Sequence, residues 1–396
     1  MRYASDQYSV LYNEFVNSSG EFYPAYGHPL EAHWKSTTGT TGWTSGFFPG
    51  VLWNLFAYNN SSDGLRRAMD VTAPTAPFAN KTDTHDVGFV IMSGYGNAYR
   101  LLRRDEYLNI MVTAARSLIT RYSSTVRCIR SWNSQEGFLV IIDNMMNLEL
   151  LFEVANLTND QTFYDIAWSH ANRTMYEHIR TDNSSYHVVE YNETDGSVIR
   201  KYTAQGYADW STWARGQSWA VYGFTVAYRY TKHQPFLDKA IGAANYFLAR
   251  LPSDTDLVPY WDFDTPYNST LVYQPRDTSA AAIFASGLLE LSQYAPTLDV
   301  RDRFWTRAKA IVDQLSSPTY LISGNKDYKL PALLANGTQG PYPKAVYDVA
   351  LPYGDYYLTQ AVIRLAESVP SGGSREDHHL NLLKLCFFLI VSYNFC

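Results

Sequence analysis

Residues 144–158 read NMMNLELLFEVANLT, and residues 161–179, which follow almost at once, read QTFYDIAWSHANRTMYEHI. In the first segment Met146, Leu150 and Val154 recur at helical spacing within a largely apolar run, which predicts a helix buried along much of its length. The second segment is richer in charge, which predicts a helix that covers the first and faces water. Together they predict a hairpin of one inner and one outer helix.

Other segments repeat this shape, with a polar or glycine-rich start, an apolar run and a polar turn. Two further charged segments resemble residues 161–179 and are predicted to be outer helices. Six inner helices alternating with outer ones predict an all-α toroid of six helical hairpins. The other predicted inner helices are 47–58, 88–104, 216–231, 278–295 and 354–367, and the other outer helices are 106–122 and 235–251.

Strand signals are few, and the clearest is a hairpin over residues 184–204 that turns at ETDG. No long linker interrupts residues 1–370, which predicts one catalytic domain. Residues 371–396 form an atypical tail whose apolar stretch, LNLLKLCFFLIVSYNFC, is too short to span a bilayer. This tail is either a terminal helix or strand or an artefact of an incorrect gene model. We favour the artefact and assign the tail no function.

The composition limits the classes of partner. A formal charge of −6, without a block of like charges, argues against a nucleic-acid surface. The 32 Tyr, 19 Phe and 10 Trp suit either a cleft that binds the apolar faces of sugars or simply an aromatic core. The 3 cysteines cannot form a disulfide framework, and no CxxC or HExxH spacing indicates a metal.

Ten N-x-S/T sequons occur, whereas chance supplies about three at this content of Asn, Ser and Thr. The excess predicts a secreted glycoprotein. The start MRYASDQ lacks the apolar run of a signal peptide, which is expected of a mature or truncated terminus. A cytoplasmic protein is the alternative. The sequons begin at Asn17, Asn59, Asn60, Asn80, Asn156, Asn172, Asn183, Asn192, Asn268 and Asn336.

The starts of the six inner helices carry most of the chemistry. They read GWTSGFFPG, THDVGF, IIDNMMN, WARGQSW, RDTSAAA and YGDYY, and parallel inner helices would bring all of them to one end of the toroid. A concave site with carboxylates, an arginine, histidines and tryptophans suits a uronic acid. Asp143, in IIDNMMN, has a simpler alternative role as the N-cap of its helix.

Five of these motifs, HDVGF, IIDNMMNLELL, WARGQSWAVYGF, DTSAAAIFASGLLEL and YGDYY, occur in the same order in a known family. Residues 10–367 resemble the unsaturated glucuronyl hydrolases, family 88 of the glycoside hydrolases. The resemblance implies an (α/α)6 barrel without a metal or organic cofactor. It also implies an exo-acting enzyme that removes a 4,5-unsaturated uronic acid from the non-reducing end of lyase-generated oligosaccharides by hydrating the C4=C5 vinyl ether.

The resemblance places the general acid/base on Asp143 and the second essential aspartate on Asp86. An acid that donates a proton to carbon must begin the cycle protonated. A helix N-terminus alone would lower the pKa of Asp143, whereas burial or a neighbouring carboxylate would raise it.

The resemblance also assigns substrate contacts, and each has a structural alternative. Arg215 is expected to bind the acidic group of the sugar, or otherwise to form a structural ion pair. Trp132 and Trp219 could be plain core, and His187 could be part of a polar hairpin. The complete expected set is Arg215, Trp219, His187, Gln205, Trp43, Trp132 and Tyr353.

Several other functions stay open. The related unsaturated rhamnogalacturonyl hydrolases share the fold and chemistry, but ARGQSW favours the glucuronyl group, because the rival group typically has Gly-Asn after this arginine. An ordinary glycosidase would use Asp86 and Asp143 at an anomeric carbon. An inactive carbohydrate-binding scaffold and a zinc site of His85, Asp86 and His187 are further alternatives. We expect a monomer that binds an unsaturated uronic-acid oligosaccharide and no membrane.

Overall fold

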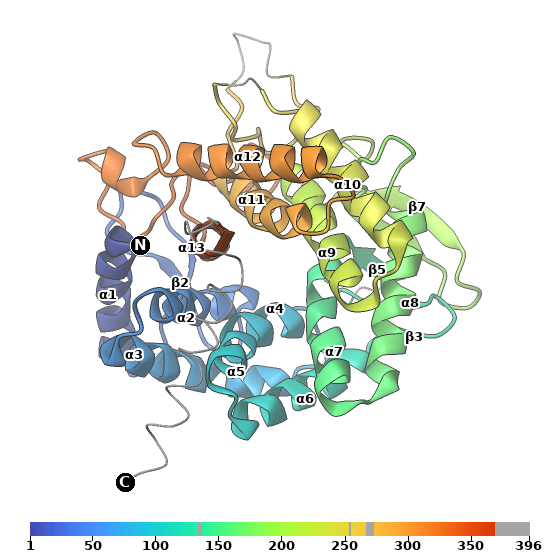
Figure 1. The fold of residues 1–396 in the computed structure, drawn as a ribbon, viewed down its shortest axis with the longest axis horizontal. Helices are drawn as coiled ribbons and strands as arrows, with labels where there is room; N and C mark the ends of the chain where they lie inside the picture. Colours follow the sequence, from blue (N-terminus) through green and yellow to red (C-terminus); the bar gives the residue numbers. More distant parts are fainter. Residues whose placement is uncertain (134–136, 253–254, 267–272, 369–396) are drawn as a thin grey trace.

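A computed structural model describes residues 1–133, 137–252, 255–266 and 273–368. The predicted (α/α)6 barrel is confirmed, since an inner ring of helices is surrounded by an outer ring (Figure 1). The inner helices follow one another around the ring, and the last packs against the first and closes it. They are α2 (Phe47–Asn59), α4 with α5 (Val87–Ile91 and Asn97–Leu102), α7 (Asn144–Thr158), α9 (Ala214–Thr231), α11 (Thr278–Ser292) and α13 (Pro352–Ser368).

The outer helices bury one face and expose the other, and three of them were predicted from the sequence. The remaining three, α1, α3 and α12, were missed. Side chains of Ser61, Asp160 and Thr297 accept hydrogen bonds from backbone N–H groups at the starts of α3, α8 and α12, as expected of N-caps. The outer helices are α1 (Arg2–Asn17), α3 (Ser62–Thr72), α6 (Asp105–Ile119), α8 (Gln161–Glu177), α10 (Gln234–Ala249) and α12 (Leu298–Leu315).

The second inner helix is irregular. A π-helical turn, η3 (Met92–Gly96), joins α4 to α5 without a gap, and the three segments together form the helix predicted at 88–104. Short 3₁₀ turns occur as η1 (Trp43–Gly46), η2 (Ala73–Asn80) and η4 (Ile322–Gly324). The turn η1 leads directly into α2 and sets the position of Trp43.

The predicted hairpin at 184–204 is confirmed, with antiparallel strands β6 (Val188–Tyr191) and β7 (Val198–Tyr202). A strand that was not predicted, β5 (Phe138–Ile141), pairs with the other edge of β6. Two smaller sheets pair β1 (Tyr23–Tyr26) with β2 (Lys35–Thr37) and β3 (Tyr122–Ser123) with β4 (Cys128–Ile129). The β5–β6 pairing matters most for function because β5 runs into Asp143 and β6 begins one residue after His187.

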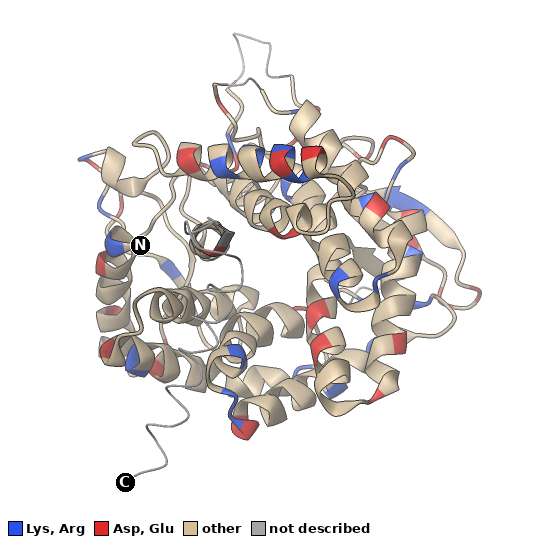
Figure 2. Cartoon of the chain, viewed as in Figure 1, with Lys and Arg blue, Asp and Glu red and all other residues tan. Residues whose placement is uncertain are grey.

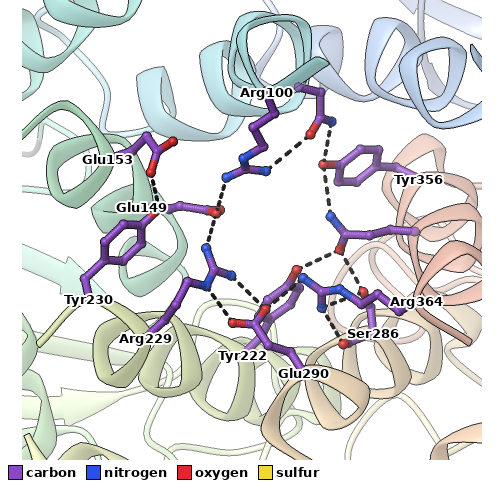
Figure 3. A network of polar contacts seen from close by, with 12 residues as sticks. Arg100, Glu149, Glu153, Tyr222, Arg229, Tyr230, Ser286, Glu290, Tyr356 and Arg364 are labelled. Atoms are coloured by element: carbon purple, nitrogen blue, oxygen red, sulfur yellow. Dashed lines mark hydrogen bonds and ion pairs between the residues drawn. The ribbon is translucent and has the colours of Figure 1, made fainter. Parts of the chain in front are cut away.

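Inside the ring, a closed circuit of polar contacts links the inner helices (Figure 3). Arg100 and Arg229 both donate to Glu149, and Arg229 also forms two bonds to Glu290, at 2.6 and 2.7 Å. Arg364 donates to Glu290 as well, at 2.7 Å. The circuit returns from α13 to α5 through Ser286, Gln360, Tyr356 and Asn97.

Glu290 is buried, the other charges of the circuit are half-buried, and each of them has a partner. Burial would raise the pKa of Glu149, but Arg100 and Arg229 outweigh burial and lower it to about 2. Burial likewise opposes ionisation of Glu290, and Arg229 and Arg364 hold its pKa below the ordinary value. The circuit therefore holds five inner helices together through charge-assisted hydrogen bonds.

The outer surface carries charges of both signs. On α12, blue and red positions alternate along the helix, whereas the inner helix α2 is tan in this view (Figure 2). Within the described ranges, no helix is both long enough and apolar enough to cross a membrane. The tail predicted at 371–396 lies outside the described residues, and the division into one domain and a tail stays a prediction.

The circuit yields a stability prediction for Glu290→Gln. Removing this charge leaves Arg229 and Arg364 buried without their shared partner, and breaking a buried pair costs about 3–5 kcal/mol. Denaturant unfolding should show a loss of this size. The control is Lys309→Met, which removes an exposed pair with Asp313 and should cost less than about 1 kcal/mol. Equal losses in the two variants would show that the circuit is not a special source of stability.

Candidate active site

The starts of the inner helices meet at one end of the barrel. The Trp43 ring, just before α2, lies 5.0 Å from the Tyr353 ring at the start of α13 and 5.7 Å from the Phe89 ring in α4. Phe89 in turn lies 5.1 Å from the ring of Trp219 in α9. The motifs that the sequence spreads over more than 300 residues therefore face one another across the barrel axis.

Asp143 occupies the N-cap position of α7 without capping it. Its side chain accepts no capping hydrogen bond, and its buried Oδ2 atom has no partner. The β5–β6 ladder continues past β5, because the Ile142 N–H donates to the His187 carbonyl at 3.0 Å. This bond brings His187 beside Asp143, with His187 Nε2 lying 3.8 Å from Asp143 Oδ2.

Four buried polar atoms without a hydrogen-bond partner gather around Asp143. Such atoms are rare in folded proteins and call for an explanation. The charges of Arg215 and Asp143 both affect the pKa of Tyr353, and the Trp219 side chain affects the pKa of Asp143. Arg215, Asp143, Tyr353 and Trp219 are therefore neighbours. The atoms are Asp143 Oδ2, His187 Nε2, Trp219 Nε1 and Tyr353 Oη. Their convergence at the helix starts is typical of a site whose polar groups contact a substrate.

The tautomer of His187 follows from its contacts. Its Nδ1 atom accepts hydrogen bonds from the backbone N–H groups of Ala204 and Gln205, at 3.1 and 3.2 Å. Burial lowers the pKa of His187 to about 3, and the Arg215 charge acts in the same direction. A neutral imidazole whose Nδ1 accepts must carry its proton on Nε2. His187 therefore presents an N–H donor towards Asp143.

Asp86, at the N-cap position of α4, has a different environment. Its Oδ2 accepts a hydrogen bond of 2.7 Å from the Thr84 hydroxyl, and His85 Nε2 lies 3.4 Å from its Oδ1. Its side chain is 21 % exposed. Trp132 lies beside this segment, half-buried, in a backbone bridge with Thr84.

The two carboxyl groups lie in different environments. Burial raises the pKa of Asp143 to about 7, the Arg215 charge opposes this shift, and the Asp86 carboxylate adds to it. Asp86 instead accepts a hydrogen bond from Thr84, lies close to His85 Nε2 and is partly exposed to solvent. Pairs of acids whose environments differ in this way can divide the roles of proton donor and charged partner.

Arg215 lies at the site, but most of its donors are engaged. Its Nη1 atom donates to Asp277 at 2.8 Å and to the Thr338 carbonyl at 2.6 Å, and Nη2 donates to the Gln339 carbonyl. Gln205 donates to that same carbonyl at 2.8 Å. The structure thus shows the ion pair that was considered as the alternative for Arg215, and the guanidinium does not present a free two-pronged edge. Its contact with a sugar carboxylate stays a prediction.

The predicted aromatic residues lie around the same end of the barrel. Tyr353 and Trp219 are buried, whereas Trp43 and Trp132 are half-buried. The Arg215 guanidinium lies over the Tyr353 ring, with Cζ 5.2 Å from its centre. All nine predicted site residues occur at or beside the helix starts, and their individual roles stay predictions.

Sequence reasoning missed several residues of this site. Trp213 packs against His187, with ring centres 4.5 Å apart, and against Arg215. Asp277 caps α11 and pairs with Arg215. Both residues stand in the quoted motifs WARGQSW and RDTSAAA, so their positions at inner-helix starts could have identified them.

The zinc alternative lacks a suitable cluster. In the part of the chain that the structure describes, no group of three or more His, Cys, Asp or Glu side chains is placed to hold a metal ion. This statement includes His85, Asp86 and His187, the three residues that such a site would use.

Comparison with known proteins identifies the family. The model of glycosyl hydrolase family 88 matches residues 24–312. An unsaturated glucuronyl hydrolase of Formosa agariphila is 38% identical over 327 residues, which cover 81% of this chain and 79% of that protein. A solved unsaturated glucuronyl hydrolase specific for heparin superimposes with a TM-score of 0.83 and 33% identity, covering 92% of this chain and 97% of the other.

A second solved structure is a variant of the Streptococcus agalactiae unsaturated glucuronyl hydrolase in complex with dGlcA-GalNAc6S. It has a TM-score of 0.76 and 28% identity and covers 93% of this chain and 91% of the other. The family match extends over well more than half of the chain, and the Formosa agariphila relative is similar over four fifths of it. The chain belongs to glycosyl hydrolase family 88.

Proposed function

We propose that this protein is an exo-acting hydrolase that releases a 4,5-unsaturated uronic acid from the non-reducing end of lyase-generated oligosaccharides. The observation that carries the proposal is the carboxyl of Asp143, whose buried Oδ2 atom has no hydrogen-bond partner and whose pKa is raised, near Asp86 at the end of the barrel where the family motifs meet. The named activities of its relatives support the same class of substrate.

The reaction needs a proton on carbon and a hydroxyl on the neighbouring carbon. Protonated Asp143 donates to C4 of the C4=C5 vinyl ether, and positive charge develops at C5 and the ring oxygen. Water then adds to C5 while the Asp143 carboxylate takes its proton, which restores the acid. The hemiketal at C5 opens, and the aglycone leaves from C1. Asp143 therefore serves as acid and base in one cycle, and the Asp86 carboxylate stabilises the intermediate positive charge.

The environment of Asp143 suits this role. A general acid works best when its pKa lies near the working pH, and the value of about 7 satisfies this condition. The Nε2–H of His187 and the indole N–H of Trp219 are free to donate to the substrate. The N-terminal ends of the parallel inner helices carry partial positive charge, which favours binding of the uronate carboxylate.

Substrate recognition is proposed to follow the predicted set. Trp43, Trp132 and Tyr353 would contact the faces of the sugar, while Arg215 acts through its charge and through the loop carbonyls that it holds. An unsaturated rhamnogalacturonyl hydrolase and an inactive carbohydrate-binding scaffold stay as alternatives. A panel of unsaturated disaccharides from chondroitin, hyaluronan, heparin and rhamnogalacturonan separates them, and turnover is read as loss of the C=C absorbance.

We also propose that the protein is secreted and glycosylated, with a cytoplasmic protein as the alternative. Five sequon asparagines are exposed, namely Asn17, Asn59, Asn60, Asn80 and Asn156, and Asn268 lies outside the described residues. Protein isolated from its native source should lose apparent mass on treatment with peptide N-glycosidase. An unchanged mass would oppose this proposal. A monomeric state stays a prediction.

The proposed acid predicts the behaviour of Asp143→Asn. This variant should fold but lose turnover of an unsaturated disaccharide by about 10²–10⁴-fold or more, because one residue performs both proton transfers. Asp160→Asn is the matched control, since Asp160 does cap its helix, Asn caps equally well, and turnover should persist. A saturated glucuronide should not be cleaved by the wild-type enzyme. Near-normal turnover by Asp143→Asn would return Asp143 to a structural role.

The same residue predicts a dependence of stability on pH. Between the unfolded pKa of Asp, about 3.9, and the folded value of about 7, the folded state keeps a proton that the unfolded state releases. Wild-type stability therefore falls as the pH rises through this window, and Asp143→Asn lacks this contribution. From pH 5 to pH 8 the free energy of unfolding of the variant should gain on the order of 2–3 kcal/mol relative to wild type. A difference that does not vary with pH would contradict a neutral Asp143.

A further inference from the structure

The motif HDVGF and the asparagine four residues after Asp143 meet inside the barrel. Asn147, on α7, approaches Gly88, on α4, so closely that a Cβ atom at position 88 would lie 2.5 Å from the Asn147 Cα. Glycine is required at position 88 for this contact, because the atom that it meets belongs to the backbone of a packed helix. The contact brings the Asn147 amide next to His85.

The orientation of the Asn147 amide follows from its two contacts. Its Oδ1 accepts the Phe89 N–H at 2.7 Å, which satisfies a free donor in the first turn of α4. Its Nδ2 lies 3.4 Å from His85 Nδ1. Because the amide oxygen is already the acceptor for Phe89, the end that faces His85 is the NH₂ group, and His85 Nδ1 must accept.

A neutral His85 therefore carries its proton on Nε2, which lies 3.4 Å from Asp86 Oδ1. His85 is 2 % exposed, and burial lowers its pKa, although the Asp86 carboxylate opposes the shift. The Asn144 side chain also lies beside the His85 ring and, like the Asp86 carboxylate, opposes the lowering of the His85 pKa. The Phe89 N–H thus donates to Asn147, the Asn147 amide donates to His85, and the Nε2–H of His85 faces Asp86.

This arrangement parallels the one at the other aspartate. His187 also has an Nδ1 atom that accepts from amides and an Nε2–H that faces a carboxyl group. At Asp86, however, the Thr84 hydroxyl supplies a second donor, whereas Asp143 Oδ2 has no partner. The contacts at Asp86 therefore orient its carboxyl group, whereas Asp143 Oδ2 is not held by a hydrogen bond.

We propose that His85 and Asn147 are positioning residues which, through the Nε2–H tautomer of His85, hold Asp86 as an oriented carboxylate during vinyl ether hydration. This inference rests on the proposed function for its kinetic consequence. Its structural basis, the tautomer of His85, is independent of which substrate the enzyme takes. The charged or titratable groups that act on Asp86 are His85, Arg121 and Asp143.

The kinetic test compares substitutions that keep or remove the donor. In His85→Leu the donor is lost, and kcat should fall about ten- to hundredfold with little change in KM, because the N–H that faces the Asp86 carboxyl group is lost. The acid limb of the kcat/KM profile should move to higher pH. The amide nitrogen of the glutamine in His85→Gln can reach the position of Nε2. This variant should therefore recover much of kcat, and the acid limb of its kcat/KM profile should return towards the wild-type position.

Asn147→Asp tests the contact between Asn147 and His85, and the substitution is nearly isosteric. The new carboxylate keeps the Phe89 contact but accepts from His85 Nδ1, so that a neutral His85 no longer donates to Asp86. It should therefore share the kinetic defect of His85→Leu. The control is Asn54→Asp, which places a carboxylate at a buried asparagine of α2 bonded to α13. It should lower stability yet leave kcat per folded molecule and the acid limb unchanged.

The tautomer is measured directly by ¹⁵N NMR of histidine-labelled protein, with the His85 signals assigned from their absence in His85→Gln. The Nε2–H tautomer is expected in wild type, and its loss is expected in Asn147→Asp. An Nδ1–H tautomer in wild type would overturn the proposal even if no substrate were turned over. Unshifted acid limbs in both His85→Leu and Asn147→Asp would also overturn it. If wild type turned over no unsaturated disaccharide, the proposed function would fail while the NMR result still decided the tautomer.

Discussion

The structure depends on the parallel alignment of the inner helices. Parallel helices place like ends together, and the partial negative charges at their C-terminal ends repel one another unless cations offset them. Arg100, Arg229 and Arg364 lie in the last turns of α5 and α9 and in the C-terminal half of α13, where they are bridged by Glu149 and Glu290. This circuit lets the N-terminal ends gather at the opposite side, where an anionic sugar would bind.

The same alignment explains how two similar aspartates acquire different properties. Asp86 and Asp143 occupy equivalent positions, each at the N-cap of an inner helix, and neither caps it. Their surroundings differ, however, since Asp86 accepts from Thr84 and lies 3.4 Å from His85 Nε2, while burial raises the pKa of Asp143 and His187 Nε2 lies 3.8 Å from its Oδ2. A single fold position thus supplies two carboxyl groups with different contacts.

Much of the fold could be predicted from the sequence because inner helices have long apolar runs. The outer helix α12 is amphipathic and could have been predicted but was missed, whereas α3 is short and contains Gly64 and many charges. The strand β5 was hidden in an apolar run that leads into α7, since its partner β6 lies about 50 residues away. Pattern reasoning finds local periodicity but not such distant pairing.

The site was predictable in position but not in its contacts. The motifs located the helix starts, and the predicted residues lie at these starts or, for Trp132, His187 and Gln205, in the strand ends and loops beside them. Sequence alone could not show that Arg215 pairs with Asp277 and with carbonyls more than 120 residues away, or that Asn147 reaches Gly88. These contacts join helices that are neighbours only in the closed barrel, and they determine which donors are free and which are engaged.

The central claim is that Asp143 is a neutral acid in the folded enzyme at pH 6. Infrared difference spectroscopy of wild type minus Asp143→Asn tests it, because a protonated carboxyl has a C=O band that an amide or a carboxylate lacks. Other buried carboxyls whose pKa is raised, such as Asp355 and Asp262, are common to both proteins and cancel. The account predicts a carboxylic acid band in wild type at pH 6 that disappears as the pH rises through about 7. Absence of this band at pH 6 would show that Asp143 is ionised and would contradict the account.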